Sequence, residues 1–144
     1  MYTCTGDNVP IYTNGKGVLK MELQDYFKSI IDMDNCPVVI CSSSHEIIYM
    51  NPAAADRYAK RGGAALIGKS LLDCHNAQSN ERIKQVVEWF GKSPDNNRVF
   101  TFHNDRENRD VYMIALRNDS GELIGYYEKH ERRDRDKEGF YVMD

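Results

Sequence analysis

The sequence has few cysteines, the residues that cross-link small domains through disulfides or bound metals. Its 144 residues include four cysteines, at positions 4, 36, 41 and 74, and no C-x-x-C pair. Zinc ribbons and thioredoxin-like motifs need such pairs, so both classes lose their main support. The wide, unequal cysteine spacings also do not resemble a secreted disulfide framework. We therefore expect free thiols in a reducing compartment.

Long apolar runs and an excess of one charge are also missing. No stretch approaches the roughly 18 apolar residues that span a bilayer, and residues 1–10 lack the basic start and apolar core of a signal peptide. The 22 acidic and 19 basic residues are interleaved and give a net charge of −3, without the basic face typical of nucleic-acid binding. We expect a cytoplasmic protein with neither membrane nor nucleic-acid partners.

Signatures of hydrolytic catalysis are absent too. The sequence contains no G-x-S-x-G and no H-E-x-x-H. Asp73, Cys74 and His75 are adjacent, but a nucleophilic Cys/His pair must face one another in space, which adjacency does not provide. We expect no enzymatic activity.

Apolar spacing predicts a helix before the main domain. Residues 1–17 mix Gly, Asn, Asp and Thr without a period and are interpreted as a loosely held leader. Over residues 18–34, apolar side chains recur at three- and four-residue steps, which predicts an amphipathic flanking helix. The stripe comprises Leu19, Leu23, Tyr26, Phe27, Ile30 and Ile31.

The remaining patterns predict one α+β domain over residues 35–133, followed by a polar tail over 134–144. Strands 37–41 and 46–50 form a hairpin, and three more strands lie at 98–103, 111–117 and 122–129, the last two as hairpin partners. Short helices lie between the second and third strands: one begins at Asn51-Pro52 and ends at Gly62-Gly63, and a longer one is capped by Ser79 and stopped by Gly91 and Pro94. We expect a five-stranded antiparallel sheet with a cleft between sheet and helices.

This element order and several segments resemble the PAS domain family. Residues 36–40, a polar turn and Ile47-Ile48-Tyr49-Met50-Asn51-Pro52 resemble its opening strands and helix cap. Ile67-Gly68-Lys69-Ser70 resembles its link toward the long helix, and Gly121 to Tyr126 its closing strand. Asp73-Cys74-His75-Asn76 is similar to a bacterial subgroup with a Cys-His pair before that helix. The resemblance covers about residues 34–133 and implies a standalone bacterial sensor domain.

The resemblance also implies an interior site for a small organic molecule. Aromatic side chains with polar tips are the usual lining of such a site, although each of them would equally fill a core. The candidate ligand-binding residues are Tyr49, Asn51, Tyr58, Cys74, His75, Trp89, Phe100, Phe102 and Tyr112.

Other cofactors known in the family fit less well. Flavin photoreceptors of this fold place a reactive Cys three residues after the link Gly, where this chain has Leu71. The residues around Cys74 do not match those around the covalent chromophore of photoactive yellow protein. Haem needs an axial ligand, for which His75 is best placed; in the competing interpretation His75 only bonds the backbone around Ser79 and fixes the loop. No other metal site is expected.

Partners follow from the resemblance and from the two ends of the sequence. The amphipathic helix either covers its own sheet or pairs with its twin in a homodimer. No kinase, cyclase or helix-turn-helix pattern follows Arg135, so the expected output passes to a separate effector protein. The charged stretch Glu128–Lys137 is interpreted as a solvated strand end or helix stub. A ligand-free adaptor for dimerisation or docking is the alternative function.

Overall fold

The computed structural model describes residues 11–13, 18–20 and 22–143, with side chains from residue 22 onward. Residues 1–35 form one unit and residues 36–144 a second, and each is described by itself. In the first unit, β1 (Ile11–Thr13) pairs antiparallel with β2 (Val18–Lys20), and α1 spans Leu23–Met33. The rest of the predicted leader lies outside the described residues.

The flanking helix begins at Leu23 rather than at Val18, so the predicted start was wrong. Residues 18–20 are paired as a strand instead. At the true start the Glu22 N–H donates to the Asp25 carboxylate over 3.2 Å, which satisfies a backbone group at the first turn.

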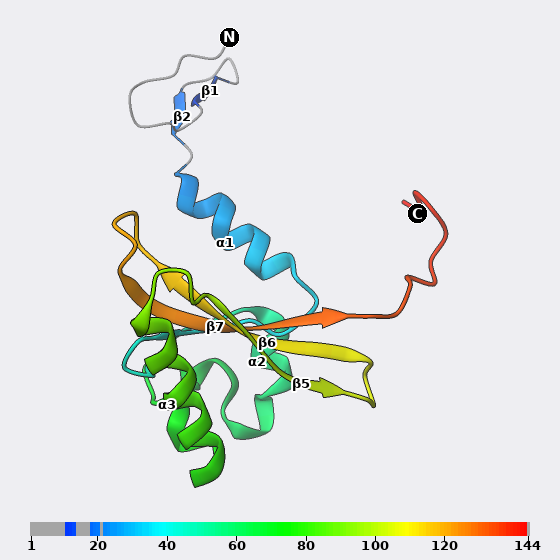
Figure 1. The fold of residues 1–144 in the computed structure, drawn as a ribbon. Helices are drawn as coiled ribbons and strands as arrows, with labels where there is room; N and C mark the ends of the chain where they lie inside the picture. Colours follow the sequence, from blue (N-terminus) through cyan, green and yellow to red (C-terminus); the bar gives the residue numbers. More distant parts are fainter. Residues whose placement is uncertain (1–10, 14–17, 21, 144) are drawn as a thin grey trace. The chain divides into compact units, whose positions relative to one another are not determined.

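The second unit contains a five-stranded antiparallel sheet, which confirms the predicted fold class. Its strand order is β4-β3-β7-β6-β5, so the first and last strands of the unit are neighbours at the centre (Figure 1). Both predicted hairpins, β3–β4 and β6–β7, are present. The strands are β3 (Val39–Ser42), β4 (Ile47–Met50), β5 (Arg98–Asn104), β6 (Arg109–Arg117) and β7 (Leu123–Arg132).

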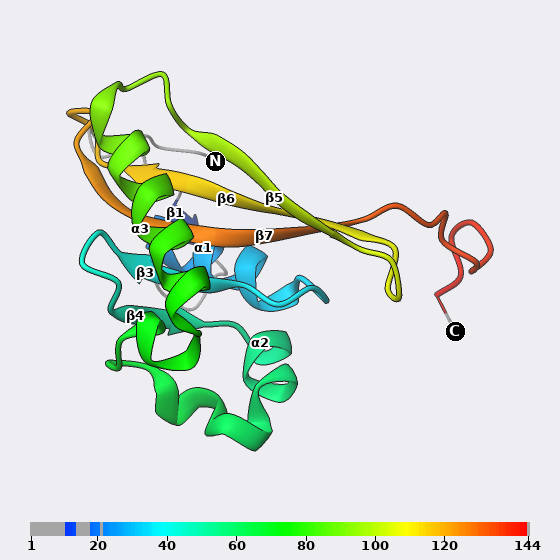
Figure 2. The same ribbon diagram turned by 60° about the horizontal axis from the view of Figure 1, so that its bottom comes forward.

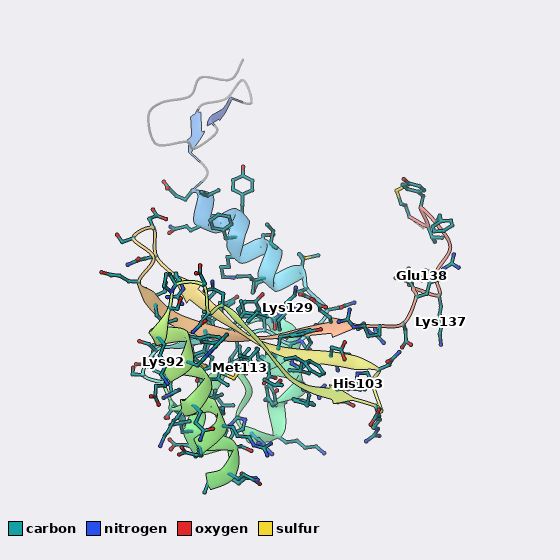
Figure 3. All side chains as sticks on the ribbon, in the orientation of Figure 1. Lys92, His103, Met113, Lys129, Lys137 and Glu138 are labelled. Atoms are coloured by element: carbon teal, nitrogen blue, oxygen red, sulfur yellow. The ribbon has the colours of Figure 1, made fainter. Side chains whose placement is uncertain are left out.

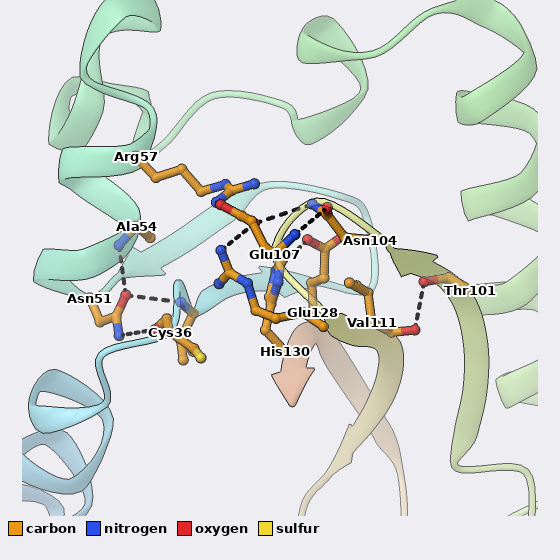
Figure 4. Close-up of polar contacts among 12 residues, drawn as sticks. Cys36, Asn51, Ala54, Arg57, Thr101, Asn104, Glu107, Val111, Glu128 and His130 are labelled. Carbon is orange, nitrogen blue, oxygen red and sulfur yellow. Dashed lines mark hydrogen bonds and ion pairs between the residues drawn. The ribbon is translucent and has the colours of Figure 1, made fainter. Parts of the chain in front are cut away.

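The helices between β4 and β5 all lie on one face of this sheet, and α3 crosses it diagonally (Figure 2). A buried cap and a salt bridge hold α2 in place: Asn51 caps its first turn, and Arg57 Nη1 lies 3.1 Å from Glu107 Oε1 in the β5–β6 turn (Figure 4). The Arg57 guanidinium holds the pKa of Glu107 below its ordinary value. The helices are α2 (Pro52–Arg57), η1 (Ala59–Arg61), η2 (Gly63–Leu66), η3 (Leu71–Cys74) and α3 (Ala77–Lys92).

The long helix α3 differs from its prediction at both ends. Asn76, not Ser79, is the cap: its side chain accepts a hydrogen bond from the Ser79 N–H over 2.8 Å. The prediction chose Ser79, although Asn76 three positions earlier has an equally suitable capping side chain. The helix also continues through Gly91 to Lys92, because glycine only weakens a helix and does not stop it.

The core lies between the helices and the inner face of the sheet. Phe90 of α3 and Ala54 of α2 are fully buried against sheet residues such as Cys41 and Met113. Side chains alternate along each strand, so Met113 points to the helical side while Lys129 lies on the other face (Figure 3). This alternation therefore identifies which side chains of each strand face the helices.

Arg117 at the end of β6 ties the sheet to the loop after α3. Its guanidinium donates to the carbonyl oxygens of Phe90, Ser93 and Asn96, at 2.8, 3.0 and 3.2 Å. It also donates to the Asn97 side chain over 2.8 Å and to the Gly121 carbonyl over 3.2 Å. A cation at the C-terminal end of a helix also complements the helix dipole.

Replacing Arg117 by methionine should lower the free energy of unfolding by about 2–3 kcal/mol, because five acceptors lose their donor. Urea unfolding followed by circular dichroism measures this change. Arg117→Lys keeps the charge but not the planar fork of donors, and should recover only part of the loss. An unfolding midpoint identical to wild type in Arg117→Met would show that water replaces these bonds at no cost.

Candidate functional site

A cavity of about 110 Å³ lies inside the second unit, between the sheet and the helices. Strands β3, β4, β6 and β7 supply one side, and η1, η2, η3 and α3 supply the other. Most of its wall is apolar, which suits the binding of an organic molecule. The lining residues are Val39, Cys41, Ile47, Met50, Tyr58, Arg61, Leu66, Leu71, Cys74, His75, Ile83, Met113, Tyr126 and Glu128.

Glu128 is the only carboxylate in this wall. It lies on the central strand β7, paired with Val39 on β3 and Met113 on β6. Its Oε1 lies 2.9 Å from Nε2 of His130, whose side chain is only 6% exposed (Figure 4). The alternation of β7 places both side chains on the helical side of the sheet.

Burial and the Glu128 charge act together on nearby groups. Burial is the main cause of the rise in the pKa of the Cys41 thiol to about 12, and the Glu128 charge contributes to that rise. The pKa values of the Tyr58 and Tyr126 hydroxyls are also raised, first by burial and then with a contribution from Glu128. These three groups are therefore neutral at physiological pH and can donate hydrogen bonds.

His45 supports the cavity from the β3–β4 turn. Its Nδ1 lies 2.9 Å from the Tyr126 hydroxyl, and its backbone has a φ of 71°. Burial lowers the pKa of His45, which favours the neutral ring. His45 lies in the turn of the hairpin predicted for residues 37–50.

The helical side of the cavity carries Arg61, Cys74 and His75. The Arg61 guanidinium donates to the Cys74 carbonyl oxygen over 3.2 Å. His75 Nδ1 lies 3.0 Å from the carbonyl oxygen of Leu71, so its backbone bond is to η3 rather than to the region of Ser79. Cys74 and the two other described cysteines, Cys36 and Cys41, are free thiols; Cys4 lies outside the described residues. Among the described residues, no three His, Cys, Asp or Glu side chains cluster as metal ligands.

The structure brings together only part of the predicted ligand-binding set. Tyr58, Cys74 and His75 line the cavity. Tyr49 and Tyr112 lie on the other face of the sheet, where Tyr112 packs under the Arg98 guanidinium. Asn51 is buried beside the cavity as a helix cap and does not line it.

The other three predicted residues, Trp89, Phe100 and Phe102, line a separate open groove of about 590 Å³ between α3 and β5. We call this the α3–β5 groove. It shares wall residues with the cavity, so the two spaces adjoin. The shared residues are His75, Ile83, Met113 and Glu128.

The sequence reading missed Glu128, Tyr126 and most aliphatic wall residues. It assigned residues 128–137 to a solvated strand end or helix stub. Strand β7 does end within them, at Arg132, and the Glu128 side chain is 39% exposed, but the His130 side chain is buried. The two-residue spacing of Tyr126, Glu128 and His130 was the available signal. It was obscured because charged residues alternate with them on the outer face.

Residues 63–70 also match the phosphate-binding pattern G-x-x-x-x-G-K-S in sequence. A phosphate site needs this pattern between a strand and a helix, with backbone N–H groups pointing into a loop. Here the segment contains η2, and the N–H groups of Gly68 and Lys69 already donate to Ile47 and Leu66. The pattern therefore does not form a nucleotide cradle.

Comparisons with known proteins agree with this geometry. The sequence model of the PAS domain matches residues 35–128. No curated protein matches the chain in sequence. Within the described ranges, no helix is both long and apolar enough to cross a membrane.

Solved structures resemble the chain in fold at low identity. A C-terminal domain from Streptococcus mutans is 18% identical with a TM-score of 0.60, over 88% of this chain and 94% of that chain. A PAS domain from Colwellia psychrerythraea is 11% identical with a TM-score of 0.57, over 77% and 97%. The PAS domain of Bordetella pertussis BvgS is 14% identical with a TM-score of 0.56, over 78% and 87%. By its family match, this chain belongs to the PAS domain family of sensory modules.

Proposed function

We propose that the protein senses a small organic molecule that binds in the cavity behind the central strands. The observation that carries this proposal is an interior space whose wall combines aliphatic side chains with the Glu128 carboxylate. Such a mixture is typical of small-molecule sites, where a few polar groups fix orientation. A core that served only stability would gain by filling this space.

The size of the cavity limits its occupant. Its 110 Å³ is below the roughly 150 Å³ of an engineered apolar cavity that takes up benzene. Pockets for drug-sized ligands begin near about 300 Å³. A haem or flavin would require the helices to move apart, so we favour an occupant of about one six-membered ring.

The charge in the wall indicates the chemistry of that occupant. Glu128 contributes negative potential at Cys41, Tyr58 and Tyr126. Its Oε1 accepts a bond from His130 when Nε2 carries the proton, and within residues 22–143 no side chain or backbone group donates to its Oε2. We propose a ligand that presents a hydrogen-bond donor or a positive charge to Glu128.

The signal passes to a separate effector in this proposal, and the protein acts as a homodimer through α1. Support comes from the apolar stripe of that helix: Phe27, Ile30 and Met33 are 56%, 70% and 81% exposed. Exposed apolar stripes of this kind mark interaction surfaces. Occupancy of the cavity would shift the equilibrium between two packings of the unit.

The first test is native mass spectrometry of protein purified from its own host, compared with denatured protein. We expect a mass excess that disappears on denaturation, and Glu128→Gln should carry less of it. Benzylamine serves as a ring-sized cationic probe in NMR titrations. Its affinity should fall roughly ten- to hundredfold in Glu128→Gln, because the charged hydrogen bond is lost.

Glu131→Gln is the matched control, because Glu131 lies on the same strand but on the outer face. It should bind benzylamine like wild type. Toluene, which has the ring but no donor, should bind wild type and Glu128→Gln equally. If no mass excess is found and neither probe perturbs the cavity residues, the ligand-free adaptor is the better description.

A further inference from the structure

A run of four exposed apolar residues follows the sheet. Phe140, Tyr141, Val142 and Met143, here called the apolar segment, are 86%, 93%, 58% and 86% exposed. Exposed contiguous apolar surface of this kind marks interaction sites. Tyr141 also has a φ of 54°, an unfavourable value for a bulky residue, so the segment would gain by adopting an extended conformation.

The α3–β5 groove offers a second exposed apolar surface on the same chain. Trp89 and Phe102 are 40% and 48% exposed there. Strand β5 is an edge of the sheet, and no strand among the described residues pairs with its outer side. An open edge beside an apolar groove can accept an added strand, which gains backbone hydrogen bonds and buries alternate side chains.

We propose that the apolar segment of one molecule docks in the α3–β5 groove of a second copy, as an added antiparallel strand along β5. Aromatic and β-branched residues such as Phe140, Tyr141 and Val142 favour the strand conformation.

A second copy is the occupant because the segment leaves its own groove open. None of the residues that line the groove belongs to the segment, and the chain from Lys137 and Glu138 onward lies beyond the end of β7 (Figure 3). Reciprocal exchange between two copies uses each segment and each groove once. It therefore gives a closed, two-fold symmetric dimer.

Trp89 is the single tryptophan of the chain, so its fluorescence reports directly on the groove. The double variant Phe140→Ser/Tyr141→Ser should emit at longer wavelength than wild type, because Trp89 stays in water. Adding an excess of a Trp89→Phe copy, which has an intact apolar segment but no tryptophan, should shift that emission back to shorter wavelength. Circular dichroism verifies that each variant is folded.

Equal emission from the double variant and wild type would overturn the proposal. A difference that the Trp89→Phe copy does not reverse would also overturn it, in favour of docking within one molecule. The control is Phe27→Ser, which removes an exposed apolar side chain from α1 and should leave Trp89 emission unchanged. An equal shift of the Trp89 emission in Phe27→Ser would contradict docking of the apolar segment in the α3–β5 groove. These fluorescence readouts do not depend on a ligand in the cavity. The proposal of a docked apolar segment and the proposal of a ligand in the cavity can therefore be contradicted separately.

Discussion

Gly125→Ala is expected to unfold the second unit or to leave it barely stable. Gly125 lies on β7 between β3 and β6, where it pairs with Ser42 and Leu116. An added Cβ would meet the Cys41 carbonyl oxygen at 2.1 Å, with further backbone atoms at 3.1 and 3.2 Å. Backbone cannot yield as a flexible side chain does, so the central strands must separate. The expected loss is about 4 kcal/mol or more, measurable by urea unfolding.

Gly91→Ala is the control, because it should change the free energy of unfolding in the opposite direction. Gly91 lies inside α3, and a Cβ added there meets nothing within 4 Å. Alanine should raise the free energy of unfolding by up to about 1 kcal/mol, because it costs less entropy in a helix. If Gly125→Ala were as stable as wild type, the close pairing of β3 with β7 would be incorrect.

Asn51→Ala is expected to cost about 3–4 kcal/mol. The side chain is fully buried, and its Oδ1 accepts hydrogen bonds from the N–H groups of Ala54 and Val38, both at 2.9 Å. Its Nδ2 donates to the Cys36 carbonyl oxygen over 3.0 Å. Alanine removes a helix cap and leaves two further backbone groups without this partner in the interior. Thermal unfolding should show a fall in Tm of about 10 °C or more.

Asn76→Ala isolates the capping contribution. Asn76 caps α3 with nearly the same backbone angles as Asn51, and its bond to Ser79 is exposed. Its loss should cost about 1 kcal/mol. Similar costs for the two variants would mean that the bonds from Asn51 to Val38 and Cys36 contribute little.

Local patterns were sufficient to predict most of the fold. Short strand-like runs bounded by turn residues located all five strands of the sheet, and the Asn51-Pro52 start of α2 follows from capping chemistry. Errors fell where two local signals competed. Residues 18–20 continued the apolar period of α1 but form a strand, and Ser79 was predicted as the cap of α3 where Asn76, three residues earlier, is the cap.

The candidate site was harder to predict, because it depends on which face each strand turns to the helices. Aromatic residues were chosen for their chemistry, yet Tyr49 and Tyr112 lie on the outer face and Trp89 lies in the groove. Glu128 was overlooked because a carboxylate in a charged stretch normally faces water. The pairing of β7 with β3 and β6 places it on the inner face of the sheet, where its side chain lines the cavity while remaining 39% exposed.

The shared wall of the cavity and the groove has a thermodynamic consequence. Four side chains face both spaces, and among them Glu128 carries charge and Met113 lies at the centre of the sheet. If a ligand in the cavity changes the affinity of the groove for its partner by some factor, that partner must change the affinity of the cavity for the ligand by the same factor, because linkage is reciprocal. A molecule that binds behind the sheet and a partner that binds beside it would thus compete or cooperate without touching.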